Sequence, residues 1–294
     1  MTGYIIINGF KVVSAVDNQV KRLLEEFSKR DVDVKVVKND GTLVSVMGQK
    51  VSSTLEPRDF IVFLDKDRYT ARMLEKLGYR LFNKPSALEL CDDKMLTHIA
   101  LANNGIKMPK TFASPLKFFE SDDYEYLYKV EKELGYPLIV KENYGSLGKQ
   151  VYLINNHEEL ALIDRKLDKV AHVFQEFISS SRGLDYRLIV INHKVVAYMK
   201  RENKHSYLSN LASGGTSSIV NLPQEYLDMA IKASEVLDLD YCGVDILKGK
   251  DNEPILSEVN SNAFFEGIEK TTNINVASIY VNHILETIKN EKNN

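Results

Sequence analysis

The sequence predicts a mixed protein in which a small parallel α/β domain precedes a larger α+β region. In about the first 85 residues, apolar strands alternate with amphipathic helices, the pattern of a parallel sheet. Beyond them, strands follow one another through short turns. The chain has 294 residues, 44% of them hydrophobic and 27% charged, which is enough for two or three packed layers or subdomains.

Composition excludes several classes of partner. The formal net charge is -3, and Lys and Arg are spread along the chain, so nothing points to nucleic acid. Cys91 and Cys242 lie far apart and outside any metal-ligand spacing, which favours two buried thiols in a reducing compartment over a disulfide. No apolar run approaches the roughly 20 residues that cross a bilayer, and the start of the chain lacks signal-peptide features. We therefore expect the protein to be cytoplasmic and to have no membrane partner.

The first domain is expected to contain buried strands alternating with two helices. The helix at 20–27 places Leu23, Leu24 and Phe27 on one stripe, and a helix at 70–77 stops at Gly78. The pattern also predicts a hairpin-like piece around 39–41. The strands are expected at 4–7, 33–37 and 60–64.

Polar residues follow two of these strands. Ligands of parallel sheets lie beyond the carboxyl ends of the strands, which makes Asn8, Lys66 and Asp67 candidates for substrate contact. Solvated charges at strand ends are the alternative. No Gly-x-Gly-x-x-Gly occurs here, so a Rossmann dinucleotide site has no support.

A break at 83–85 separates this domain from a helix that Asp92-Asp93-Lys94 opens and Gly105 ends. Lys94 lies in the first turn, where the helix dipole disfavours a cation. Its position makes sense if it meets a phosphate, and a plain surface lysine is the alternative.

A glycine-bearing turn follows a helix at 122–134 and joins two strands within 137–153. The turn contains Gly145, Ser146 and Gly148, and its backbone amides can lie over polyphosphate, while Lys141 on the preceding strand adds a point charge. It joins two strands rather than opening a helix, so it is not a P-loop. Alone, the signal is weak, because glycine turns between strands are common.

Three further strands supply polar groups after a helix at 157–168. The strand at 173–178 offers an apolar wall for adenine with Glu176 at its edge, although an edge-strand glutamate is the alternative. On the next strand, Asp185 and Arg187 share one face. Arg201 is the last residue expected in the strand that follows, where a fixed charge can stabilise an oxyanion. A loop rich in donors at 209–216 and an amphipathic helix at 224–237 follow.

The segment 255–269 carries the most specific chemistry. Glu258 and Asn260 lie two apart on a short strand, and Asp245 lies on the strand before it, so the three can face one ion. Two carboxylates and an amide oxygen are hard ligands that suit magnesium, whereas an exposed hairpin with ordinary charges is the alternative. A last helix is expected at 275–288, with a polar tail at 289–294. The histidines show no ligand spacing, and no nucleophile elbow is present.

The ordered set of these motifs resembles the ATP-grasp superfamily, and most closely its RimK-type α-L-glutamate ligases. The resemblance covers about residues 85–285. Glu266-Gly-Ile-Glu269-Lys-Thr-Thr272 also resembles the RimK-type pattern. The motifs that carry the resemblance are Asp93-Lys94, Gly105-Ile-Lys-Met-Pro109, Pro137-Leu-Ile-Val-Lys141, Gly145-Ser-Leu-Gly148, Gln175-Glu-Phe-Ile178, Asp185-x-Arg187, Arg201, Ser209-Asn210-Leu, Gly243-Val-Asp245-Ile and Glu258-Val-Asn260.

The resemblance implies a pre-ATP-grasp α/β domain at 1–85, a central lid subdomain at 86–180 and a C-terminal subdomain with the metal site at 181–294. It implies a ligase that phosphorylates a carboxylate with ATP and lets an amine attack the acyl phosphate. Lys94, Lys141 and the loop of Gly145, Ser146 and Gly148 would then hold phosphates. Gln175, Glu176, Phe177 and Ile178 would meet adenine, Asp185 ribose or acceptor, and Arg187 phosphate or substrate. Asp245, Glu258 and Asn260 would bind magnesium or manganese, and Arg201, Lys141 and Asn210 would serve catalysis.

Two departures concern the substrates, which are expected to be a small-molecule or peptide carboxylate and an amine. Ala212-Ser213-Gly-Gly replaces the family's His-Arg-Gly-Gly, and Asn262-Ala263-Phe264 replaces its Ser-Pro-Gly. Glutamate as the incoming amine is therefore open. A non-catalytic ATP-binding regulator and an ATP-dependent phosphotransferase are the alternative functions. A homo-oligomer, dimer or tetramer, is common in the family.

Overall fold

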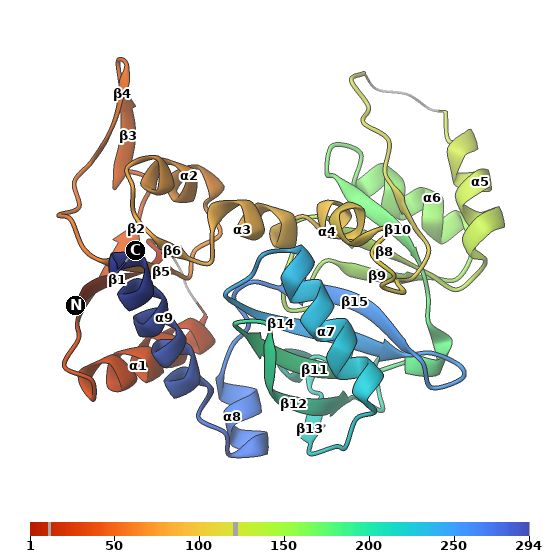
Figure 1. The fold of residues 1–294 in the computed structure, drawn as a ribbon. Coiled ribbons are helices and arrows are strands. Elements are labelled where there is room, and N and C mark those ends of the chain that lie inside the picture. Colours follow the sequence, from red (N-terminus) through yellow and green to blue (C-terminus); the bar gives the residue numbers. More distant parts are fainter. Residues whose placement is uncertain (11–12, 120–122, 294) are drawn as a thin grey trace.

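The computed structural model describes residues 1–10, 13–119 and 123–293, which form three larger sheets, a separate two-stranded sheet and the helices around them (Figure 1). The N-terminal sheet has the order β2-β1-β5-β6, and its paired strands are all parallel. Both features confirm the predicted α/β domain. Its strands are β1 (Thr2–Asn8), β2 (Asp33–Asn39), β5 (Phe60–Phe63) and β6 (Leu81–Phe82).

Two helices pack on this sheet because each has one apolar stripe. Helix α1 (Ser14–Ser28) buries Val20, Leu23 and Phe27, and α2 (Arg68–Lys76) begins at the cap Asp67, whose side chain accepts from the amides of Tyr69 and Thr70. Asp67 therefore caps a helix and does not line the cleft described below.

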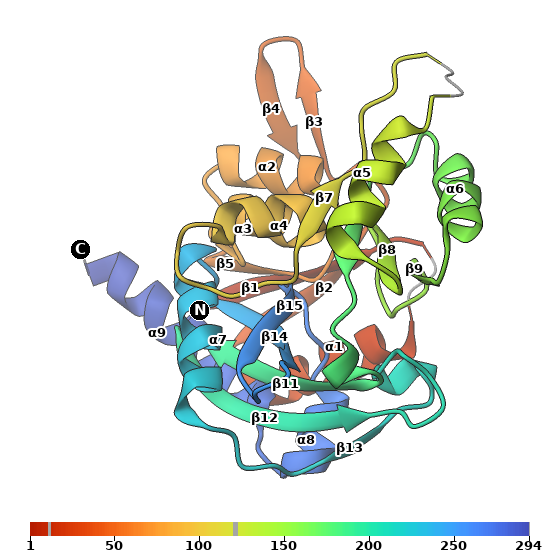
Figure 2. The same cartoon turned by 90° about the vertical axis from the view of Figure 1, so that its right-hand side faces the viewer.

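The predicted hairpin at 39–41 is wrong in position. Asn39 ends β2, and its side-chain oxygen accepts from the Gly41 amide, which makes a local turn. The hairpin is formed by β3 (Val44–Met47) and β4 (Lys50–Ser53), which project from the body of the molecule in both views (Figures 1 and 2).

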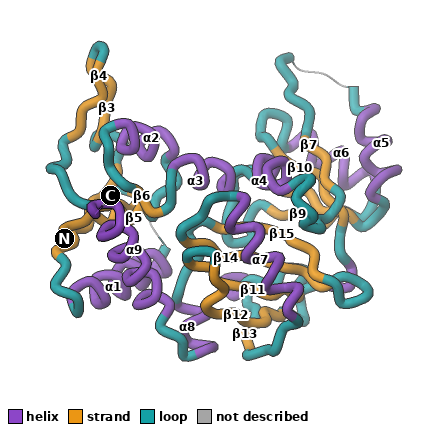
Figure 3. Tube along the Cα trace, viewed as in Figure 1, coloured by secondary structure: helices purple, strands orange, loops and turns teal. Residues whose placement is uncertain are grey.

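The break predicted at 83–85 is the start of a short helix. Pro85 occupies the first turn of α3 (Pro85–Asp92), where its missing amide hydrogen costs nothing. Asp93 then caps α4 (Lys94–Leu101), as expected. These two helices join the N-terminal sheet to the rest of the chain (Figure 3).

The central sheet is antiparallel, with the order β7-β10-β8-β9. Helices α5 (Glu125–Leu134) and α6 (His157–Lys166) cover one face, where Phe174 and Val140 are buried. The predicted start of α5 at 122 lies outside the described residues. Because strand side chains alternate, Ile139, Lys141 and Gln175 lie on the other face. Its strands are β7 (Thr111–Ala113), β8 (Leu138–Glu142), β9 (Val151–Ile154) and β10 (His172–Glu176).

The C-terminal sheet is also antiparallel, with the order β13-β12-β11-β14-β15. Helix α7 (Gln224–Val236) packs on one face, and α8 (Glu266–Thr272) and α9 (Val276–Asn293) follow the last strand. The strands are β11 (Leu184–Ile191), β12 (Lys194–Glu202), β13 (Thr216–Ser218), β14 (Tyr241–Lys248) and β15 (Pro254–Asn260), with short 3-10 turns at Ser179–Ser181 and Leu211–Ser213.

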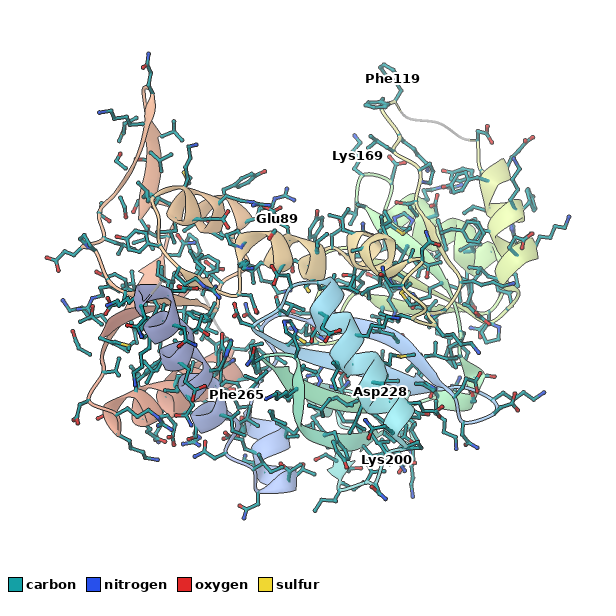
Figure 4. All side chains as sticks on the ribbon, in the orientation of Figure 1. Glu89, Phe119, Lys169, Lys200, Asp228 and Phe265 are labelled. Carbon is teal, nitrogen blue, oxygen red and sulfur yellow. The ribbon has the colours of Figure 1, made fainter. Side chains whose placement is uncertain are left out.

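Helix α9 ties the two ends of the chain together. It runs through most of the predicted polar tail to Asn293 and packs against α1, so the N-terminal and C-terminal sheets share one apolar core. Phe265 lies in this core, whereas Phe119 lies at the tip of a projecting loop (Figure 4). Both cysteines are buried and free, as predicted. In the described parts of the chain, no helix has the length and apolarity that a membrane span needs.

Candidate functional site

A cleft of about 470 Å³ takes lining residues from all three sheets. This size falls within the range of small-molecule sites, about 300–1,000 Å³. Every residue that the sequence suggests for nucleotide, metal or catalysis lines it. These residues are Lys94, Lys141, Gly145, Ser146, Gly148, Gln175, Glu176, Phe177, Ile178, Asp185, Arg187, Arg201, Asn210, Asp245, Glu258 and Asn260.

The glycine loop between β8 and β9 closes one side of the cleft. Gly148 and the preceding Leu147 have φ of 75° and 61°, a left-handed conformation that glycine adopts easily and leucine rarely. Lys94, at the first position of α4, reaches the loop, with its Nζ 3.3 Å from the carbonyl oxygen of Gly145. The helix start and the loop therefore meet at one point of the cleft.

Lys141 places a positive charge on the cleft wall. It is half-buried, and among the described residues its ammonium group makes no hydrogen bond and no ion pair within 4.0 Å. Burial lowers its pKa to about 8, with Glu258 opposing and Lys94 reinforcing the shift. An unpaired cation that burial destabilises is suited to bind an anion.

The two strands β14 and β15 bring the predicted metal ligands together. Asp245 and Glu258 are direct cross-strand partners, and Asn260 Nδ2 lies 3.5 Å from Asp245 Oδ2. The Glu258 carboxylate lies 4.0 Å from Lys94 Nζ and lines the cleft. Oxygen ligands on adjacent strands fit a hard divalent cation.

Asp245 is the ligand that fits this cation least well, because two arginines already hold it. Arg187 donates to both carboxylate oxygens at 2.7 and 2.6 Å, and Arg201 lies 3.0 Å from Oδ2. Burial opposes ionisation, but the two arginines keep the pKa of Asp245 below its usual value. A cation bound here would use Glu258 and Asn260, and it would compete with Arg187 and Arg201 for the Asp245 carboxylate. Within the described residues, no group of three His, Cys, Asp or Glu side chains is placed to hold a metal.

Asp185 and Arg201 form a second buried pair. Arg201 donates to Asp185 at 2.7 and 2.5 Å, and Ser209 Oγ donates to the same carboxylate at 2.6 Å. Both Asp185 oxygens accept from these neighbours, so the residue positions Arg201, and it also lines the cleft. Burial disfavours the charge on Arg201, but its two carboxylate partners raise its pKa, which keeps it cationic.

The end of β10 forms the apolar wall expected for a purine. Phe177 and Ile178 line the cleft, and Glu176 Oε2 accepts from the backbone amide of Lys110 at 3.1 Å. The buried Gln175 side chain hydrogen-bonds to His98 and Thr111. Glu176 thus ties β10 to the chain before β7, while Gln175 faces the cleft.

The N-terminal domain contributes the far end of the cleft. Asn8 and Lys66, two of the candidates for substrate contact, line it, and Asn8 Nδ2 donates to Asp65 at 3.1 Å. Lys66 pairs with Asp92 at 2.5 Å. Of the two segments that depart from the RimK-type pattern, 262–264 lines the cleft, whereas Ala212 and Ser213 do not.

Three residues that support the site were given no individual role from the sequence. Asn83 is fully buried and makes hydrogen bonds to the backbone of Tyr241 and Ser261. It thereby connects the start of β14 to the residue after β15. Nothing in its local sequence shows this, because its partners lie far along the chain. Ser209 had a signal, since it precedes Asn210 in the donor loop. His98 had one too, because it lies four residues after Lys94 on the same face of α4.

Comparisons with known proteins identify the family and the fold. The model of the RimK-like ATP-grasp domain matches residues 91–284. A probable alpha-L-glutamate ligase of Maridesulfovibrio salexigens is 34% identical over 217 residues, which cover 72% of this chain and 69% of that protein. N-acetylaspartylglutamate synthase A of Homo sapiens is 28% identical over 289 residues, covering 93% and 73%. The crystal structure of D-alanine--D-alanine ligase from Bacillus anthracis with ATP superposes with a TM-score of 0.76 at 18% identity, covering 100% and 99%.

Proposed function

The chain belongs to the RimK-like ATP-grasp family and is an ATP-dependent ligase, and on that premise we propose that it joins a carboxylate to an amine through an acyl phosphate. One observation supports the proposal above all. The unpaired ammonium of Lys141 and the open oxygen ligands of Glu258 and Asn260 line the same cleft.

These groups would reduce the electrostatic repulsion between the two reacting anions. A carboxylate and the γ-phosphate are both anions, so their approach needs fixed positive charge on both sides. Lys141 and Lys94 would neutralise phosphate from the side of the glycine loop. Arg201, held by Asp185 and Asp245, would face the developing charge from the C-terminal sheet. Bound magnesium, held by Glu258 and Asn260, would supply further charge to the phosphates.

The glycine loop and its neighbours would protect the activated carboxylate from water. An acyl phosphate hydrolyses readily, so exclusion of water decides whether amide or acid forms. The loop of Gly145, Ser146 and Gly148 lies next to Leu208 and Asn210, since a Cβ on Gly148 would come within 3.2 Å of Leu208 Cδ1 and 3.5 Å of Asn210 Oδ1. It is therefore already packed against the donor loop that we assign to the acyl group.

The amine is proposed to be an amino acid, and glutamate is the first to test. The names of two relatives contain a glutamyl group. The acceptor end of the cleft combines Asn8 and Lys66 with the segment 262–264, which differs from the RimK-type pattern. The carboxylate partner is proposed to be a small metabolite, cofactor or peptide.

Hydroxylamine trapping tests the reaction class. Purified protein is incubated with Mg-ATP, pooled carboxylates and hydroxylamine, and the products are analysed by mass spectrometry. Hydroxamate formed together with ADP supports an acyl phosphate. ADP and a stable phosphorylated product without hydroxamate would instead indicate a phosphotransferase. ATP binding without ADP release in any mixture would indicate a non-catalytic regulator.

A further inference from the structure

A chain of buried hydrogen bonds leads from α4 to the cleft wall. His98 Nδ1 lies 2.9 Å from the backbone carbonyl oxygen of Lys94, and His98 Nε2 lies 3.1 Å from Gln175 Nε2. Gln175 Nε2 also lies 3.0 Å from Thr111 Oγ1. His98 and Gln175 are 7% and 3% exposed, so none of these groups can turn freely to water for a partner.

The identity of each donor follows from the partners at the ends of the chain. A carbonyl oxygen only accepts, so His98 Nδ1 must carry the proton that faces Lys94. Burial lowers the pKa of His98, so the ring is neutral at pH 7 and its Nε2 can only accept. The group of Gln175 that faces His98 must then be the amide nitrogen.

Thr111 imposes the same orientation independently. Its hydroxyl donates to the carbonyl oxygen of Pro109 at 2.9 Å, which leaves Thr111 Oγ1 as an acceptor toward Gln175. A rotation of the Gln175 amide by 180° would place its oxygen against two acceptors. Two neighbours therefore fix the nitrogen inward and the carbonyl oxygen outward.

The outward oxygen meets the cleft. Both hydrogen bonds found for the Gln175 side chain in the described part of the chain use its nitrogen. Among the described residues, Asn143 Oδ1 alone is a buried side-chain atom without a partner, so Gln175 Oε1 is accessible. Gln175 lines the cleft beside Phe177 and Ile178, the wall assigned to the purine.

We propose that His98 is a positioning residue for nucleobase choice, which holds Gln175 so that its carbonyl oxygen accepts from a purine with an amino group at C6. A purine with a carbonyl oxygen at C6 would meet another acceptor there and lose a hydrogen bond. The inference rests on the proposed function, because it assumes that a purine nucleotide lies against Phe177 and Ile178.

The test compares the affinities of three nucleotides by calorimetry, which needs no turnover. ATP carries the 6-amino group, inosine triphosphate a 6-oxo group, and purine riboside triphosphate neither. The wild-type protein should prefer ATP over inosine triphosphate by about tenfold or more. In His98→Met, the preference for ATP over inosine triphosphate should fall about fivefold, which corresponds to the loss of one hydrogen bond. The affinity of this variant for purine riboside triphosphate should stay within about twofold of the wild-type value.

Two further variants keep the test decisive. If His98→Met does not fold, Thr111→Val removes the other acceptor and should lower the preference in the same direction. In Gln175→Met the preference should be lost, and adding His98→Met to it should change nothing more, because the two residues act as one unit. An equal loss of affinity for all three nucleotides, or an unchanged preference, would show that His98 is only structural. If the wild-type protein fails to bind ATP, the proposed function itself fails.

Discussion

Lys141 is the residue whose environment makes the most direct prediction. Burial lowers its pKa to about 8, so the group is charged below that pH and loses its charge above it. Since the proposed role requires the cation, kcat/KM for ATP should fall about tenfold per pH unit above about pH 8. Rates measured from about pH 6.5 to about pH 9.5 check this.

Lys141→Arg is the matched variant for this pH profile. A guanidinium group stays charged throughout the range, although its shape differs and the maximal rate will be lower. The decline above about pH 8 should therefore disappear in Lys141→Arg. An identical decline in both proteins would assign it to another group.

Substitution of Glu258 distinguishes a role in metal binding from a structural role. Glu258→Gln keeps the shape of the side chain but removes the charge, so turnover should fall about a hundredfold or more and half-saturation by magnesium should need a higher concentration. Asn260→Ala should act in the same direction. Glu253→Gln is the control, because Glu253 lies on the same hairpin but pairs with Lys107 outside the cleft. Substantial activity in Glu258→Gln with an unchanged thermal transition contradicts the metal assignment.

At the residue scale, the sequence locates the cleft but not its ion pairs. Strand alternation predicts that Asp185 and Arg187 share a face, yet it cannot give the register of the neighbouring strands. In the structure, Asp185 lies opposite Arg201 and Arg187 lies opposite Asp245. Asp185 and Asp245 are therefore also partners of arginines. A β-bulge between Ile189 and Val190 shifts the register of the β11–β12 hairpin, and β14 pairs with β11 from far along the chain, so neither ion pair can be read from the sequence.

At the scale of elements, β7 and α8 were not predicted because they are too short to show a periodic pattern. Long periodic helices such as α1, α6 and α7 were predictable, because their apolar stripes repeat over several turns. Strand β7 has three residues, two of them exposed, and helix α8 has seven, so neither shows a period. Both are held by contacts with β10 and with the C-terminal sheet.

The contact between α1 and α9 gives a stability prediction. Glu26 is buried on α1 and accepts hydrogen bonds from Lys29, Arg30 and Asn275, the last at 2.9 Å from the segment before α9. Burial opposes its charge, but these bonds lower its pKa to about 2. Because the pKa of Glu26 is lower in the folded protein, its carboxylate stabilises the fold above the unfolded pKa of 4.5. This stabilisation is lost as the pH falls toward about 2.

Glu26→Gln tests this contribution. The variant should lower the free energy of unfolding at pH 7 by about 2 kcal/mol, and its stability should depend less on pH below the unfolded pKa than that of the wild-type protein. Chemical denaturation at several pH values measures both effects. Glu25→Gln is a control on the same helix, because Glu25 is exposed and, among the described residues, its side chain bonds Arg22 alone. Parallel curves for the wild-type protein and Glu26→Gln would exclude the assignment.

At the scale of the whole molecule, the three sheets divide into two mechanical units. The N-terminal and C-terminal sheets share a core that includes α1, α8 and α9, whereas the central sheet has a core of its own with α5 and α6. Strand–helix alternation and the family resemblance predict the three regions. They do not predict that the first and last share a core, because α9 at the end of the chain packs against α1 near its start. We expect the central sheet to move as a unit over the cleft.

Arg68 is the contact that would hold this unit in place from the N-terminal side. From α2 it lies 5.8 Å from the ring of Tyr144 and donates to its hydroxyl at 3.3 Å, directly beside the glycine loop. Arg68→Ala should therefore speed amide hydrogen exchange in a peptide spanning 143–150 roughly two- to fivefold in nucleotide-free protein, as expected for loss of one exposed cation–π contact. Arg72→Ala is the control, because Arg72 lies one turn along the same helix and pairs with Glu89 rather than with the central sheet. Equal acceleration in both variants would mean that α2 as a whole has loosened, and no acceleration in either would mean that the glycine loop is held by Lys94 and the C-terminal sheet alone.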